Sequence, residues 1–196
     1  AGAGTVNIPD TVGYAMPEEF GALIKGIMDK VRNIKKAVIS VHCHNDLGLA
    51  VANALAAIRN GAGQVECTVN GIGERAGNAP MEETVLALLT MYGIDVGIDY
   101  GRLNEVSTLV QKLSGTTVPT NRPFIGEGAY TIESGIVTGW YRQAFEKNPT
   151  TVYPVLPRFV GHEAPKIVMG KKSGTDNIEI WKKKLELNLS DEEGMA

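Results

Sequence analysis

Short β-branched, apolar runs alternate with amphipathic stretches over the first half of the chain, and this alternation restricts the possible folds more than any other feature. The runs that predict strands are residues 5–8, 37–44 and 64–70. The stretches with helical spacing of apolar residues are 17–31, 48–60 and 80–93. Strands joined through single helices by short links are typical of a parallel sheet with right-handed crossovers. The chain is therefore predicted to be an α/β protein.

The alternation fades after about residue 101. Helices are predicted at 102–115, within 128–147 and at 175–185, whereas 116–124 and 148–165 are punctuated by proline and irregular. We therefore expect two domains, with residues 1–120 forming the parallel αβ part and residues 121–196 forming a small, mostly helical subdomain. The start at AGAGTVN and the end at LSDEEGMA lead us to expect a segment of a longer protein.

Charge and hydropathy exclude several classes of partner. The 19 Lys and Arg residues against 22 Asp and Glu give a net charge of −3, so no basic field is available to attract nucleic acid or an anionic membrane. No apolar run approaches the roughly 20 residues that span a bilayer, and the first residues given do not have the charged-then-apolar pattern expected of a secretion signal. Two cysteines are too few for a disulfide framework, which predicts a cytoplasmic protein.

Two of the three histidines, His42 and His44, lie at the end of the second predicted strand. Residues two apart on a strand face the same side, so both imidazoles can reach one divalent ion while Cys43 points away. The alternative is a pair of hydrogen-bonded polar residues. The position at a strand end, where parallel α/β folds bind ligands, favours the metal. Two histidines do not complete a site, so further nitrogen or oxygen ligands are required.

Further polar residues fall on the same rim, because the carboxyl ends of parallel strands meet there. Thr11 follows the first predicted strand; it is either a substrate contact through its hydroxyl or a turn residue. Asn78 ends the loop GIGERAGN, and its amide oxygen is a candidate metal ligand, although Asn is also common in turns. Glu66, Thr68 and Asn70 are predicted to share one face of the third strand.

Other reactive side chains have structural interpretations. Glu74 and Arg75 are expected to form an ion pair within their loop. Cys43 and Cys67 are expected to pack in the interior, because neither belongs to a recognisable nucleophile motif. His162 is expected to be a surface or turn histidine.

The segments NIPDTVGY, VHCHNDLGLAVANALAAIRNGA and QVECTVNGIGERAGN together resemble the isopropylmalate synthase and homocitrate synthase family of metal-dependent TIM barrels. HMG-CoA lyases are more distant members of this superfamily. The strong motifs cover residues 5 to about 90, and weaker similarity (RPFIGEGAY, IESGI, GKKSG) continues to about 190. The resemblance implies the C-terminal portion of a (β/α)8 barrel, about three βα units, followed by a helical linker subdomain. Three strands cannot close a barrel, so the N-terminal part is expected in cis or from a partner chain.

The resemblance also implies a chemistry. His42, His44 and Asn78 would bind a divalent metal (Mg²⁺, Mn²⁺ or Zn²⁺), and Thr11 would contact the carboxylate of a 2-oxo acid. The implied reaction is a Claisen-type condensation of that acid with acetyl-CoA, performed by a homo-oligomer that is expected to be a dimer. The loop GERAGN lacks the cysteine of the lyases, which favours a synthase.

The chain departs from the family in two ways. The Arg-Asp motif that supplies a catalytic arginine and a carboxylate ligand is missing, and Ile132 and Val137 stand where many synthases have histidines. The catalytic acid and base therefore lie elsewhere or are substituted. Two alternatives follow: a lyase that catalyses the reverse carbon–carbon cleavage, and a non-catalytic subunit that completes a partner's barrel.

Overall fold

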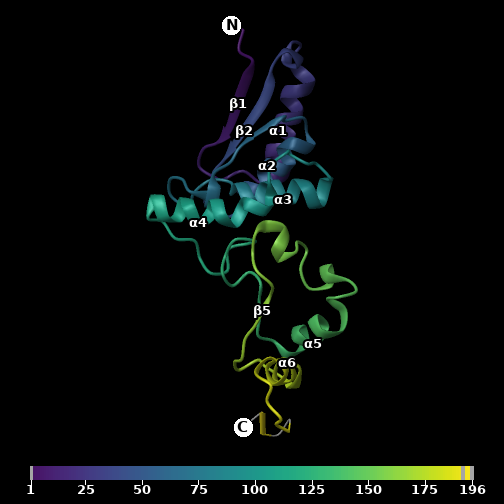
Figure 1. Ribbon diagram of the computed structural model, residues 1–196. Helices are drawn as coiled ribbons and strands as arrows, with labels where there is room; N and C mark the ends of the chain where they lie inside the picture. Colours follow the sequence, from purple (N-terminus) through teal and green to yellow (C-terminus); the bar gives the residue numbers. More distant parts are fainter. Residues whose placement is uncertain (1, 191–192, 195–196) are drawn as a thin grey trace. The chain divides into compact units, whose positions relative to one another are not determined.

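A computed structural model describes residues 2–190 and 193–194, and the chain divides into two compact units (Figure 1). The first unit comprises Ala1–Ile98 with Leu109–Thr116, and the second comprises Asp99–Thr108 with Thr117–Ala196.

The first unit contains a three-stranded parallel sheet in the order β1-β2-β3. Its strands are β1 (Thr5–Asp10), β2 (Val38–Cys43) and β3 (Gln64–Glu66), and its helices are α1 (Pro17–Lys30), α2 (Ala50–Arg59) and α3 (Met81–Tyr92). The register pairs Pro9 with His42, and His42 with Glu66. The predicted parallel α/β arrangement is confirmed for this unit.

Helices α1 and α2 cover one face of this sheet (Figure 1). The buried residues that form the core come from both helices and from β2: Phe20, Ile24, Ile39, Val41, Cys43, Ala50, Ala54 and Ala57. The alanines of α2 recur at helical spacing, so a smooth stripe of small side chains lets this helix approach the sheet closely. Ser40 and His42 alternate with the core residues of β2 and therefore belong to the opposite, more polar face.

Two strand boundaries differ from the prediction. β1 continues through Pro9 to Asp10, where a turn was expected, and Pro9 is paired with His42 of β2. β3 ends at Glu66, and Val69–Gly71 form a 3-10 turn in which Asn70 has φ 63°. The prediction that Glu66, Thr68 and Asn70 share a strand face is therefore wrong, since the chain has left the strand before Thr68.

The second unit is built from short elements. It contains α5 (Gly135–Ala144), α6 (Thr175–Leu185) and a two-stranded parallel sheet of β4 (Thr131–Ile132) and β5 (Lys166–Ile167), while α4 (Leu103–Ser114) is divided between the units. The buried Asn177 of α6 donates to the carbonyls of Glu133 (2.9 Å) and Val168 (3.2 Å), which fastens the helix to the end of the sheet. The helix predicted at 175–185 is confirmed, and the small sheet was not predicted.

Short 3-10 helices connect these elements: η1 (Ile34–Lys36), η2 (Val69–Gly71), η3 (Tyr100–Arg102), η4 (Pro149–Thr151) and η5 (Pro157–Val160). None of the helices in the described part of the chain combines the length and the apolar character that crossing a membrane requires.

Candidate metal centre

The loops that follow the three parallel strands meet at one rim of the sheet. The His44 N–H donates to the Asp10 carbonyl (3.2 Å), which joins the ends of β1 and β2. His44 also forms an isolated antiparallel bridge with Asn78, and the Asn45 N–H donates to the Gly77 carbonyl (2.9 Å). The backbone therefore brings the candidate ligands His42, His44 and Asn78 to the same rim.

The two histidine side chains face each other through their Nε2 atoms, which are 3.3 Å apart. Their ring planes are inclined at 75°, so they meet edge to face. Two nitrogen ligands at about 2.1 Å from one ion, with tetrahedral or right-angled geometry, lie about 3.0–3.4 Å apart. The observed separation fits a shared ion, and it also fits a direct hydrogen bond between the two rings.

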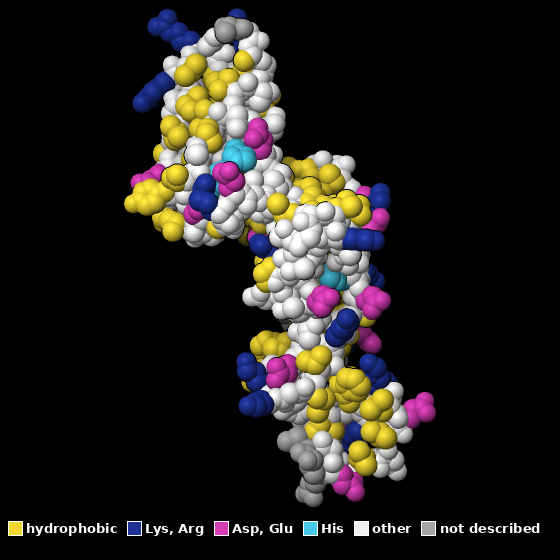
Figure 2. All heavy atoms as spheres, turned by 90° about the vertical axis from the view of Figure 1, so that its left-hand side faces the viewer, with side chains coloured by type: hydrophobic (Ala, Val, Ile, Leu, Met, Phe, Trp, Pro, Cys, Tyr) yellow, Lys and Arg dark blue, Asp and Glu magenta, His cyan; other side chains and the backbone are white. Residues whose placement is uncertain are grey.

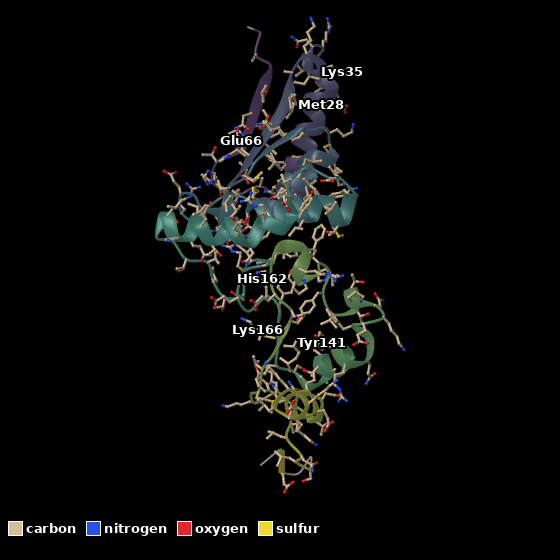
Figure 3. All side chains as sticks on the ribbon, viewed as in Figure 1. Met28, Lys35, Glu66, Tyr141, His162 and Lys166 are labelled. Carbon is tan, nitrogen blue, oxygen red and sulfur yellow. The ribbon has the colours of Figure 1, made fainter. Side chains whose placement is uncertain are left out.

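Glu66 lies beside the first of these rings. Its Oε2 is 3.3 Å from His42 Nδ1, and Asn7 Nδ2 donates to the same oxygen (3.4 Å). The contact is electrostatic only, because His42 Nδ1 has no hydrogen-bond partner among the described residues, so the carboxylate does not fix the tautomer of the ring. Figure 3 labels Glu66 on β3, and Figure 2 shows histidine flanked by acidic side chains on this surface. Sequence reasoning missed this contact, although Glu66 is opposite His42 in the strand register.

Asn78 presents a buried amide oxygen to the rim. Its side chain donates through Nδ2 to the Ile72 carbonyl (3.4 Å), and Oδ1 has no hydrogen-bond partner among the described residues. A buried polar atom without a partner is uncommon, and an amide oxygen is a suitable ligand for hard cations. Asn78 therefore retains the capacity to contribute an oxygen ligand.

The donor set is incomplete as a metal site. No group of three or more His, Cys, Asp or Glu side chains that could hold a metal occurs within residues 2–190 and 193–194. The available donors are two imidazole nitrogens and one amide oxygen, a mixture that suits borderline and hard divalent ions. Substrate, water or other protein residues would have to supply the remaining ligands.

Arg75 connects the three rim loops. It binds Asp46 in a bidentate manner (Nε to Oδ1 2.8 Å, Nη2 to Oδ2 3.1 Å) and also donates from Nη2 to the Thr11 carbonyl (2.7 Å). The predicted contact with Glu74 is present at a longer 3.8 Å. Thr11 is exposed in the turn after β1, so its hydroxyl remains accessible while its carbonyl is bound.

The Arg75–Asp46 pair should be visible in an NMR titration. The Arg75 hydrogen bonds hold the pKa of Asp46 below its ordinary value, and Asp46 likewise raises the pKa of Arg75. Because the folded-state pKa is lowered, the stabilisation is present above the ordinary pKa of aspartate and is lost as pH falls through the lowered value. We expect Arg75→Gln to return the Asp46 carboxyl signal toward its ordinary titration. Unchanged titration would contradict the bidentate pairing, and Arg102→Gln, which removes the separate pair with Glu105, is the control.

Asp10 and Asn53 form a buried polar pair beneath the rim. Asn53 donates from Nδ2 to Asp10 Oδ2 (3.1 Å) and to the Ala15 carbonyl (2.9 Å). Asp10 also accepts from the backbone N–H groups of Tyr14 (3.2 Å) and Ala15 (3.4 Å). These bonds hold the turn that carries Thr11, and sequence reasoning did not identify Asn53, whose only signal is an amide within an alanine-rich helix.

Gly77 is required by the close packing of the rim loop. Its φ is +86°, and a Cβ atom at this position would overlap the Gly71 carbonyl oxygen. Gly93 ends α3 with φ +66°, but open space surrounds the corresponding position. The two glycines therefore share left-handed backbone conformations and differ in steric room.

We expect Gly77→Ala to lower the free energy of unfolding by at least about 3 kcal/mol, because backbone strain and a backbone clash act together. Gly93→Ala should lower it by about 1 kcal/mol, from the backbone conformation alone. Chemical denaturation of the complete protein measures both. Equal losses in the two variants would show that the contact with Gly71 is unimportant.

The cysteines are not activated. Burial, followed by the nearby charge of Asp10, raises the pKa of Cys43 to about 12, and burial also raises the pKa of Cys67. A thiol that stays protonated is a poor nucleophile, which agrees with packing roles for both residues. Ile132 is buried in β4 and Val137 lies on α5, so neither position offers a group for proton transfer.

Comparison with known proteins identifies the family. Residues 1–110, more than half of the chain, match the HMGL-like family. The chain belongs to the HMGL-like family. The 2-isopropylmalate synthase of Syntrophus aciditrophicus is 50% identical over 98% of the chain, and that of Pyrococcus furiosus is 49% identical over 98%. The chain spans 37% and 38% of the lengths of these two relatives.

Solved structures agree with this HMGL-like assignment. The hydroxymethylglutaryl-CoA lyase of Pseudomonas aeruginosa is similar with a TM-score of 0.51 and 25% identity, covering 58% of this chain and 39% of the lyase. The structural neighbours are TIM-barrel proteins of the HMGL-like family, so the resemblance inferred from the sequence motifs is confirmed.

Proposed function

We propose that this chain is part of an acyltransferase that condenses acetyl-CoA with a 2-oxo acid, in the manner of 2-isopropylmalate synthase. The observation that carries this proposal is 50% identity to such a synthase over 98% of the chain, which includes both units. The identity to the HMG-CoA lyase is half as high and covers 58% of the chain. A synthase is therefore favoured over a lyase.

The proposed substrates follow from the chemistry of the product. Removing the acetyl unit from 2-isopropylmalate leaves 2-oxoisovalerate, so this is the first 2-oxo acid to test. A divalent ion, when bound, would polarise the keto oxygen as a Lewis acid. His42 and His44 would hold that ion through Nε2, and Asn78 through Oδ1. The exposed hydroxyl of Thr11 would bind the acid's carboxylate.

Other residues of the rim would act by positioning. Glu66 would support the position of the His42 ring electrostatically, since its Oε2 lies 3.3 Å from His42 Nδ1. Arg75 would keep the Thr11 turn in register with the other two loops through its bond to the Thr11 carbonyl. The described residues of the rim provide no carboxylate ligand for the metal, and Arg75 is engaged with Asp46 and Thr11, so we assign the carboxylate ligand and the catalytic arginine to other parts of the complete protein.

We further propose that the three βα units form part of a closed barrel. In the described sheet, β1 and β3 each pair only with the central strand β2. The outer edge of each therefore has no strand partner among the described residues. Large apolar side chains are exposed on and after β1, including Val6, Val12 and Tyr14, and Figure 2 shows hydrophobic side chains gathered on this face. Further strands in cis or from a partner chain would cover them.

We also expect the complete protein to be a homodimer. The two free thiols agree with the proposed cytoplasmic location.

An assay of thiol release tests the proposal. The complete protein is incubated with acetyl-CoA, Mg²⁺ or Mn²⁺ and a panel of 2-oxo acids that includes 2-oxoisovalerate, pyruvate and 2-oxoglutarate. We expect release of free coenzyme A that depends on the oxo acid and on the metal. Release with none of them would overturn the synthase proposal. Cleavage of a 3-hydroxyacyl-CoA would then support the lyase, and inactivity in both assays would support a non-catalytic subunit.

A further inference from the structure

The loop between β3 and α3 closes on itself next to the side chain of Asn78. The Asn78 N–H donates to the Gly71 carbonyl (3.1 Å), and the Gly77 N–H donates to the Glu74 carbonyl (2.9 Å). The Asn78 residue is 8% exposed, and its Nδ2 donates to the Ile72 carbonyl (3.4 Å). The amide that is a candidate metal ligand is therefore held by residues of this loop.

Gly73 lies directly against that amide. A Cβ atom built on Gly73 would lie 2.6 Å from Asn78 Nδ2, 2.7 Å from Cγ and 2.8 Å from Oδ1. All three distances are shorter than the 3.0 Å that real Cβ atoms keep from other heavy atoms. Because the three distances are nearly equal, the added atom would lie over the flat face of the amide. The amide can therefore keep its observed orientation only while residue 73 has no side chain.

The contact at Gly73 differs from those of the other glycines in the loop. Gly71 and Gly77 have left-handed backbone, with φ +68° and +86°, whereas the φ of Gly73 is not positive. At Gly77 an added Cβ would meet the Gly71 carbonyl oxygen, which belongs to the backbone. At Gly73 it would meet the end of a side chain, which can change its rotamer without breaking the loop. A Cβ at Gly73 would therefore displace the amide more than it would destabilise the fold.

We propose that Gly73 is a positioning residue of the metal site. The absence of its side chain lets the Asn78 amide keep the orientation that leaves Oδ1 without a hydrogen-bond partner among the described residues. The main chain of Asn78 is fixed separately, through its bridge with His44. A Cβ at Gly73 would therefore move the amide oxygen and leave the histidines in place. This inference rests on the ligand role proposed above for Asn78.

The variant Gly73→Ala of the complete protein tests the inference. We expect the affinity for Mn²⁺, measured by EPR titration, to fall by about tenfold, because groups that orient a ligand have effects of this size. In ¹⁵N NMR spectra recorded without metal, the side-chain amide signals of Asn78 should also move; their loss in Asn78→Ala assigns them. The control is Gly93→Ala, which strains the backbone at the end of α3 but places its methyl group in open space. It should change neither the affinity nor the amide signals.

A double-mutant cycle shows whether Gly73 acts through Asn78. Asn78→Ala removes both the amide oxygen and the atoms that a Cβ at residue 73 would meet. Adding Gly73→Ala to this variant should therefore lower the affinity for Mn²⁺ no further. Equal losses caused by Gly73→Ala in both backgrounds would overturn the inference. Unchanged Mn²⁺ affinity, or unmoved amide signals, in the single variant would overturn it as well.

Failure of the metal site itself would give a different result. If the unmodified protein does not bind Mn²⁺, the proposed metal site is wrong, and the positioning role of Gly73 is wrong with it. If the unmodified protein and Gly73→Ala bind Mn²⁺ equally, only the role of Gly73 is wrong. Melting temperatures check that each variant folds. If Gly73→Ala alone does not fold, recovery of folding in Gly73→Ala/Asn78→Ala would support the contact, and failure to recover would overturn it.

Discussion

Replacing both His42 and His44 by alanine is expected to remove the bound divalent ion and to abolish condensation. The two Nε2 atoms are the only nitrogen ligands that the described rim offers, and they face each other at 3.3 Å. We expect the affinity for Mn²⁺ to fall by at least about 100-fold, with a loss of kcat/KM of at least the same size. Metal analysis of the purified protein and the thiol-release assay measure the two effects.

A milder variant separates the loss of a metal ligand from the loss of a group that only orients that ligand. Glu66→Gln keeps both imidazoles but replaces the carboxylate next to His42 Nδ1, so metal affinity should fall by only about tenfold. Circular dichroism confirms that each variant is folded. Metal content that stays unchanged in the double histidine variant would refute the metal assignment. Loss of the metal with activity retained would instead favour the non-catalytic subunit.

Asn53→Asp is expected to destabilise the protein in a pH-dependent manner. The substitution is isosteric, but it replaces an amide donor that lies 3.1 Å from Asp10 Oδ2 with a second carboxyl group. Two carboxylates this close and this buried cannot both ionise without a large penalty. We expect the free energy of unfolding at pH 8 to fall by about 2–4 kcal/mol.

The sign of the pH dependence follows from linkage. The new carboxyl should have a folded-state pKa raised above its unfolded value, so the folded protein binds more protons between these two values. The Asn53→Asp variant should therefore lose stability as pH rises. Near pH 4 it should approach the stability of the unmodified protein, because the introduced carboxyl is then protonated and can still donate to Asp10. Urea denaturation at several pH values measures this. Asn60→Asp alters a similar amide that bonds only to Ala56, near the end of α2, and should show a much smaller slope.

The parallel α/β architecture and the position of the rim could be predicted from the sequence. The two-residue repeat of a strand places His42 and His44 on the same side, and the observed contact between their Nε2 atoms agrees with this. The long periodic helices were predicted because their apolar spacing is a local property. The end of β3 was missed because Val69–Gly71 turn where the local pattern still resembles a strand. Metal binding by these residues remains a prediction.

The amino-acid sequence by itself determines which residue types lie at each strand end. It also determines to which side of the strand neighbouring residues point, because this is a local property of the backbone. The partners of these side chains are not local. Glu66 contacts His42 because the register of β2 and β3 pairs them, although they are far apart in the chain. Arg75 reaches both Asp46 and Thr11 because three loops converge. Backbone conformation and side-chain direction follow from nearby residues, whereas such contacts depend on strand register and loop packing, which arise from the whole fold.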